Sequence, residues 1–139
     1  MKGKLSAALS AILLLWSGAA ADAAPRNVGA KEAAALIEAN RRNESFVILD
    51  LRTPKEYADE RIAGAVLVDF LAPTFRGELA RLDRGKTYLV YCRTGNRSGR
   101  ALRLFDELGF GEVVHLAAGI VGWREAGLPT VRGTGGGRS

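Results

Sequence analysis

Short apolar segments alternate with helical patterns along this chain, and that alternation constrains its fold more than any other feature. Strands are predicted over 46–49, 65–68, 87–91 and 112–116, which are largely apolar and lack the polar alternation of a half-exposed strand. Strands that are apolar on both sides belong in a parallel sheet covered by helices on both faces. The sequence therefore predicts an α/β fold, in which ligands gather at the carboxyl ends of the strands.

Helical patterns fill the gaps between the predicted strands. They cover 31–40, a segment starting at Pro54, 75–82, 97–108 and 119–126. Thr53 is the expected N-cap of the helix at Pro54, with Glu56 at its third helical position. Apolar residues at i, i+3, i+4 and i+7 give the helix over 97–108 one inward face, and Gly109 follows as its C-cap.

Residues 1–23 have the three-part pattern of a secretory signal peptide. Lys2 and Lys4 are followed by a largely apolar run over 5–16 and then by small residues up to Ala23, the expected cleavage point. The apolar run is shorter than the roughly 20 residues of a membrane span. We therefore expect an exported protein, located in the bacterial periplasm, with no stable membrane span in the mature chain. An uncleaved anchor or a buried helix is the alternative.

Cleavage would leave one domain and a tail. Residues 28–130 hold all the predicted strands and helices and are long enough for a core of their own. Residues 131–139 are predicted to be a disordered tail, since the stretch over 132–139 has four glycines and no large apolar residue.

The net charge of +5 is a mild basic excess. No run of Lys and Arg with interleaved aromatics occurs, so a nucleic-acid partner is not expected. The excess suits a small anion better, because two arginines flank the single cysteine.

Cys92 lies between a predicted strand and a predicted helix, in the segment YLVYCRTGNRS. The loop amides, the helix N-terminus, Arg93 and Arg97 all supply positive potential there, which predicts a thiolate nucleophile in an anion-binding loop. A lone cysteine forms no internal disulfide, and one histidine leaves no Cys/His metal cluster, so neither a metal nor a cofactor is expected. The alternative is a buried cysteine that only packs.

Four segments carry a resemblance to a known family. They are DLRTPKEY over 50–57, IAGA over 62–65, CRTGNRS over 92–98 and LAAGIVGW over 116–123. In order and spacing they resemble the motifs of single-domain rhodanese-like sulfurtransferases, from about Val28 to Pro129. The cysteine loop with both arginines is the specific match, whereas the Asp-x-Arg and Gly-Ala elements are individually weak.

The resemblance implies a central five-stranded parallel sheet and a reaction at Cys92. The cysteine would accept sulfane sulfur from a small anionic donor such as thiosulfate, form a persulfide, and pass the sulfur to cyanide, a thiol or a protein acceptor. By position, the substrate-binding residues are Arg93, Thr94, Gly95, Asn96, Arg97 and Ser98. Asp50 is a supporting residue that orients the loop or caps a helix, and Arg52 contacts substrate or pairs with a carboxylate.

Several residues depart from the family pattern. Glu60 and Arg61 stand where Gly-His is common, and Ala118 replaces a glycine in a turn that is expected to favour positive φ. His115, the only histidine, is predicted to be structural or solvent-facing and not catalytic. The loop is one residue shorter between cysteine and arginine than in phosphatases that share this fold, which disfavours phosphatase activity.

Three functional hypotheses remain open. The first is the exported sulfurtransferase, the second a non-catalytic binding module on the same scaffold, and the third a thiol redox sensor. Retention of the cysteine and both arginines favours the first, and the lack of a second, resolving cysteine weakens the third. A thiol that is protonated at neutral pH, or walled off from solvent, would contradict the enzyme hypothesis.

Overall fold

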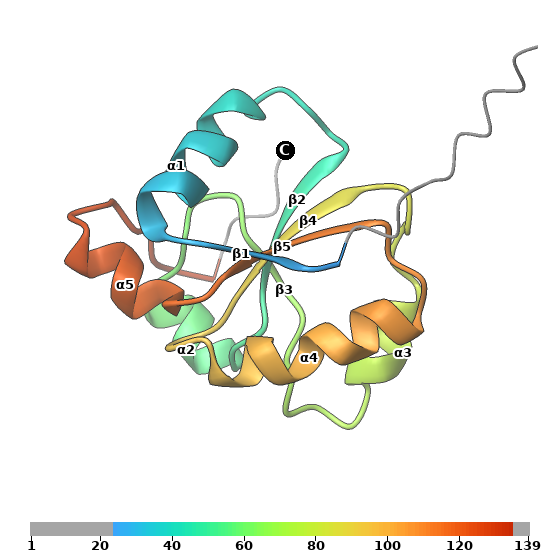
Figure 1. The fold of residues 1–139 in the computed structure, drawn as a ribbon. Coiled ribbons are helices and arrows are strands. Elements are labelled where there is room, and N and C mark those ends of the chain that lie inside the picture. Colours follow the sequence, from blue (N-terminus) through green and yellow to red (C-terminus); the bar gives the residue numbers. More distant parts are fainter. Residues whose placement is uncertain (1–23, 135–139) are drawn as a thin grey trace, which may run out of the picture.

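The computed structural model describes residues 24–134, which form one five-stranded sheet with helices on both sides (Figure 1). The strands are β1 (Arg26–Val28), β2 (Phe46–Asp50), β3 (Val66–Leu67), β4 (Thr87–Tyr91) and β5 (Glu112–Leu116). Their order in the sheet is β1-β5-β4-β2-β3, and every neighbouring pair is parallel. The predicted five-stranded parallel α/β architecture is confirmed.

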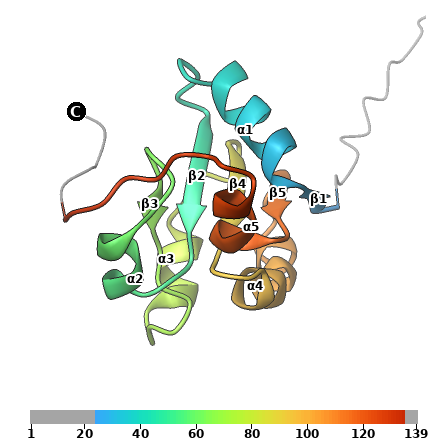
Figure 2. The same cartoon turned by 90° about the vertical axis from the view of Figure 1, so that its left-hand side faces the viewer.

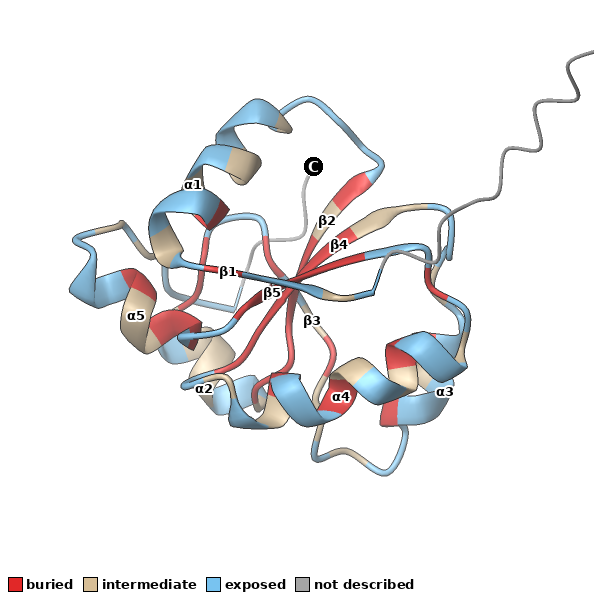
Figure 3. Cartoon of the chain, in the orientation of Figure 1, coloured by how far each residue is buried: buried red, intermediate tan, exposed pale blue. Residues whose placement is uncertain are grey.

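Two helical layers bury the sheet. The helices are α1 (Ala30–Ala39), α2 (Pro54–Asp59), α3 (Phe75–Ala80), α4 (Asn96–Glu107) and α5 (Gly119–Glu125). α1 and α5 cover one face of the sheet, and α3 and α4 cover the other (Figures 1 and 2). Along β4, Leu89 joins the core under α1 and α5, while Val90 joins the core under α3 and α4. The central strands are therefore buried on both sides, as Figure 3 shows.

The sequence pattern missed β1 and overstated β3. β1 pairs only with β5, and Arg26 and Asn27 are exposed, so Val28 is its single buried residue and the strand lacks an apolar run. β3 is the opposite edge strand and pairs with β2 only through Val66 and Leu67. The apolar signal at β1 is weak because two of its three residues are exposed, whereas the apolar run over 65–68 is longer than the two residues that pair in β3.

The chain after α5 returns to the end of α2. Val131 forms an antiparallel bridge with Arg61, and the N–H of Gly133 donates to the carbonyl of Ala58 at 2.8 Å. Arg61 is 2% exposed and its guanidinium stacks over Tyr57 at 4.3 Å from the ring centre. Residues 131–133, assigned from sequence to the disordered tail, are thus anchored on a buried arginine.

Two predictions lie outside the described residues, namely the signal peptide over 1–23 and the end of the tail over 135–139. Within residues 24–134, none of the helices has the length and apolar character needed to cross a membrane.

Candidate active site

Cys92 directly follows β4, at the carboxyl edge of the sheet, and a short loop leads from it into α4. Gly95 is the N-cap of α4 and has φ of 93°, a conformation that L side chains rarely adopt. A Cβ atom at Gly95 would lie 1.9 Å from the carbonyl oxygen of Ala117. The loop therefore requires glycine at this position, both for its backbone angle and for its contact with the β5–α5 turn.

The first turn of α5 holds the loop from the other side. The N–H groups of Ile120 and Val121 donate to the carbonyl oxygens of Cys92 and Arg93 at 3.0 and 3.1 Å. Gly119 has φ of 63°, and a Cβ atom there would lie 2.2 Å from the oxygen of Arg93. The positive φ expected in this turn does not fall on Ala118, whose φ is −83°; it falls on Gly119.

The hydrogen-bond donors of the loop converge on the sulfur of Cys92. The N–H of Gly95 lies 3.1 Å from Sγ and donates to it, and the hydroxyl of Ser98 lies 3.2 Å from Sγ, within reach to donate to it. Burial is the largest single influence on the pKa of Cys92, and it acts to raise that pKa. Hydrogen bonds from the Ser98 side chain and from the backbone of Ser98, Gly95 and Thr94 together outweigh it, so the pKa lies below its ordinary value. The loop can therefore stabilise a thiolate.

The two loop arginines differ in what they contact. Arg97 makes a two-pronged ion pair with Glu56, with both N···O distances at 2.8 Å. Arg93 is exposed, and its guanidinium makes no ion pair with any residue in the described part of the chain. Of the two predicted anion-binding side chains, Arg93 is free to reach an incoming anion, whereas the Arg97 donors are directed at Glu56.

Glu56 joins the loop to the start of α2. Its carboxylate also accepts from the backbone N–H of Thr53 at 3.0 Å, so the N-cap predicted at Thr53 is confirmed and forms a capping box with Glu56. The hydrogen bond from Arg97 is the main cause that lowers the pKa of Glu56 to about 2. The sequence indicated Glu56 only as a helix cap; its pairing with Arg97 depends on the packing of α2 against the loop.

Asp50 and Arg52 form a buried network behind the loop. Arg52 donates to Asp50 through Nε at 2.9 Å and Nη2 at 2.6 Å, and Tyr91 donates its hydroxyl to Asp50 at 2.7 Å. Of the two predicted roles for Arg52, the structure shows the carboxylate pair. Because Tyr91 immediately precedes Cys92, this network fixes the strand end from which the loop departs.

His115 is buried and not solvent-facing. Its side chain lies beside α4, with Nε2 2.7 Å from the hydroxyl oxygen of Ser98 and Nδ1 2.9 Å from the amide oxygen of Asn27. Only 5% of its surface is exposed. The sequence could not reveal this arrangement, because Asn27 belongs to the strand that has no apolar signal.

Cys92 is itself 1% exposed. Burial of the thiol counts against the enzyme hypothesis and in favour of a non-catalytic binding module. Its neighbours Arg93, Thr94 and Asn96 are exposed, whereas Cys92 is not.

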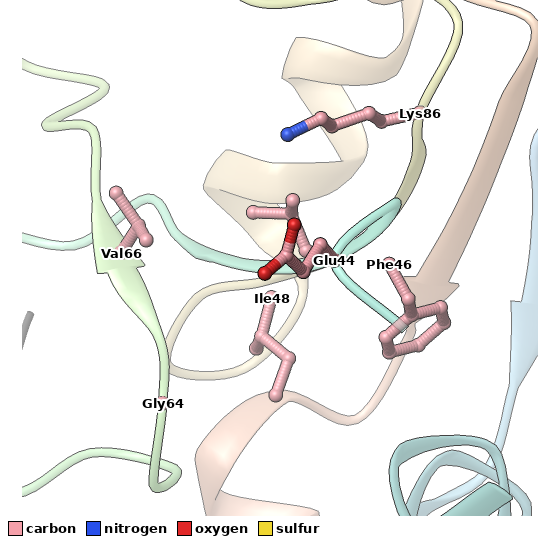
Figure 4. Close-up of a pocket in the computed structure, with 7 residues that line it drawn as sticks. Glu44, Phe46, Ile48, Gly64, Val66 and Lys86 are labelled. Carbon is pink, nitrogen blue, oxygen red and sulfur yellow. The ribbon is translucent and has the colours of Figure 1, made fainter. Parts of the chain in front are cut away.

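A separate hollow of about 300 Å³ lies at the opposite edge of the sheet (Figure 4). Glu44 and Lys86 supply its charged groups, just before β2 and β4, and Val66 of β3 lines it. Cys92 lies at the carboxyl end of β4, so this hollow is not part of the cysteine site.

Comparisons with known proteins agree with this geometry. The profile of the rhodanese-like domain matches residues 30–126. Protein slr1261 of Synechocystis is 35% identical over 94 residues, covering 66% of this chain and 50% of that protein, so the chain spans about half its length. The thiosulfate sulfurtransferase PspE of Escherichia coli is 32% identical over 85 residues, covering 61% of this chain and 78% of that protein.

A solved structure shows the same fold. The rhodanese-related protein of Thermoplasma volcanium superposes with a TM-score of 0.63 at 30% identity, covering 76% of this chain and 97% of that one. The chain therefore belongs to the rhodanese-like domain family, whose sulfurtransferase members support sulfur transfer as its chemistry.

Proposed function

We propose that this chain is an exported thiosulfate-type sulfurtransferase, in which Cys92 carries sulfane sulfur as a persulfide to a nucleophilic acceptor. The observation that carries the proposal is the convergence of hydrogen-bond donors on Sγ, which lowers the pKa of a buried thiol. Each sulfur species in such a cycle is anionic, so the same donors serve the thiolate, the donor and the persulfide.

The chemistry needs no metal and no general base once the thiolate has formed. The thiolate attacks the outer sulfur of thiosulfate, the S–S bond of the donor breaks, and sulfite leaves with the electron pair. Cyanide or a thiolate then attacks the outer sulfur of the persulfide and regenerates the Cys92 thiolate. The exposed Arg93 is the side chain placed to attract the donor, since guanidinium groups bind sulfonate-type oxygens in pairs.

Export is the second part of the proposal. It is supported by the basic start, the apolar run and the small residues of 1–23. N-terminal sequencing of the protein purified from a bacterial periplasm tests it. A start near residue 24 is expected, and a chain that keeps Met1 in the cytoplasm would contradict it.

Intact-mass spectrometry tests the chemistry directly. Wild-type protein treated with thiosulfate should gain the mass of one sulfur atom, and cyanide should remove it with release of thiocyanate. Cys92→Ser should gain nothing while keeping the fold, as measured by circular dichroism. Arg124→Ala is a control, because Arg124 is exposed and its ion pair is with Glu60 and not with a residue of the cysteine loop; it should gain sulfur like the wild type.

A non-catalytic binding module is the second candidate, favoured by the 1% exposure of Cys92. It predicts no added sulfur on the wild type with thiosulfate or with any other sulfane donor. That result would overturn the sulfurtransferase proposal.

A further inference from the structure

A chain of hydrogen bonds runs from Cys92 through three elements of the fold. Sγ of Cys92 lies 3.2 Å from the hydroxyl of Ser98 on α4, and that hydroxyl lies 2.7 Å from Nε2 of His115 on β5. Nδ1 of His115 lies 2.9 Å from the amide oxygen of Asn27 on β1. Ser98 is fully buried and His115 is 5% exposed, so these hydrogen bonds are shielded from water.

Each of these hydrogen bonds needs one donor and one acceptor, and this requirement limits where the protons can lie. An amide oxygen only accepts, so Nδ1 of His115 carries a proton toward Asn27. Ser98 has one hydroxyl proton, which it gives either to Sγ or to Nε2. If Ser98 donates to Nε2, the thiol of Cys92 must donate to Ser98; if Ser98 donates to Sγ, Nε2 must donate to Ser98.

These are two complete hydrogen-bond arrangements. The first contains a neutral thiol and a neutral imidazole, and the second contains a thiolate and an imidazolium. They differ by one proton moved along the chain, and neither leaves a buried polar group unpaired. Sγ also accepts from the N–H of Gly95, which favours the second arrangement because a thiolate accepts hydrogen bonds better than a thiol.

We propose that Cys92, Ser98 and His115 form a proton relay, in which ionisation of the thiol delivers its proton to His115. The S–H bond breaks as the Ser98 oxygen takes that proton, while the original hydroxyl proton of Ser98 passes to Nε2. The net charge of the three groups does not change. His115 is a positioning residue that acts on the sulfur through Ser98, and the relay deepens the proposed function, on which it rests for its role in turnover.

The groups around His115 suit this role. Its hydrogen-bond partners, Ser98 and Asn27, are uncharged, and Gly99 is the α4 residue whose added Cβ would lie 3.7 Å from its ring. Apart from Arg97, the charged residues on the neighbouring elements β1 and α4 are all exposed; they are Arg26, Arg100, Arg103, Asp106 and Glu107. The neighbouring strand β4 contributes two titratable residues, Tyr88 and Tyr91.

Burial lowers the pKa of His115. An imidazolium at this position is therefore unfavourable by itself and gains its stabilisation from the thiolate. Cys92 and His115 should titrate as a pair, each shifting the other.

The composition makes the relay measurable, because the chain has one histidine and one cysteine. The full chain without a polyhistidine tag is titrated by NMR of the imidazole nitrogens and by thiolate absorbance in the ultraviolet. His115 should keep its second proton to higher pH in the wild type than in protein alkylated at Cys92. His115→Gln, which keeps a hydrogen-bond partner for Ser98 but accepts no proton, should raise the midpoint of Cys92 by about one unit, or tenfold less thiolate.

Two outcomes overturn the relay. One is an imidazole titration that is the same before and after alkylation, which needs no variant to fold. The other is an unchanged Cys92 midpoint in a folded His115→Gln. Neither measurement uses a sulfur donor, so a failure of persulfide formation is distinguishable from a failure of the relay.

Discussion

Replacing Glu56 with glutamine should lower the free energy of unfolding, because it removes the carboxylate that pairs with Arg97. Glu56 accepts two hydrogen bonds from Arg97 and one from the Thr53 backbone, and these lower its pKa from 4.5 to about 2. At about 1.4 kcal/mol per pKa unit, this difference corresponds to about 3 kcal/mol of folding free energy. The side chain is 28% exposed, so solvent screening reduces the expected loss to about 2 kcal/mol.

The pH dependence of this loss has a defined sign. The pKa of Glu56 is lower in the folded state than in the unfolded state, so its contribution is complete above about pH 4.5 and is lost as the pH falls toward 2. Urea unfolding at a series of pH values should therefore show the largest gap between wild type and Glu56→Gln at pH 7, with the gap narrowing below pH 4.5.

Glu38→Gln is the matched control for Glu56→Gln. Glu38 pairs with Arg41 at 3.2 Å, and both side chains are about 70% exposed. Such a pair is worth about 0.5 kcal/mol. If Glu56→Gln costs no more than Glu38→Gln at pH 7, or if its cost does not change with pH, the assignment of Glu56 as the anchor of Arg97 is wrong.

Three further predictions concern the loop. Gly119→Ala should unfold at lower urea concentration than Gly127→Ala, because both glycines have positive φ but only Gly119 would place a Cβ against the loop backbone; equal midpoints in urea unfolding would contradict this. Arg97→Ala should raise the pKa of Cys92, since it removes a nearby positive charge, and should weaken the use of thiosulfate in a steady-state assay; an unchanged thiol titration would refute it. Asn27→Asp should stabilise the His115 imidazolium and lower the midpoint of Cys92, as measured by thiolate absorbance; a higher midpoint would contradict the relay.

The interior strands could be predicted because burial on both faces leaves a continuous apolar run. β2, β4 and β5 therefore agree with the sequence pattern closely. The N-cap at Thr53 could also be predicted, since Thr53 and Glu56 lie within one helical turn. β1 could not be predicted, because two of its three residues are exposed and the strand therefore has no apolar run.

The site shows the same division between local and distant contacts. Cys92 and its loop amides are local in sequence, so the anion-binding loop was predictable from CRTGNRS. The Arg97–Glu56 pair and the Ser98–His115–Asn27 chain each span distant segments, and neither has a local signature. The burial of Cys92 likewise depends on how α5 packs against the loop, which no local pattern reports.

Hydrogen-bond donors of the loop are expected to keep the sulfur of Cys92 ionised and available for reaction. The most direct measurement is the rate of Cys92 alkylation by iodoacetamide in the folded protein as a function of pH, read by intact mass. We expect complete reaction with a midpoint below the usual cysteine pKa of about 8.5. A midpoint at or above that value, or a folded protein that is not alkylated at any pH, would contradict it.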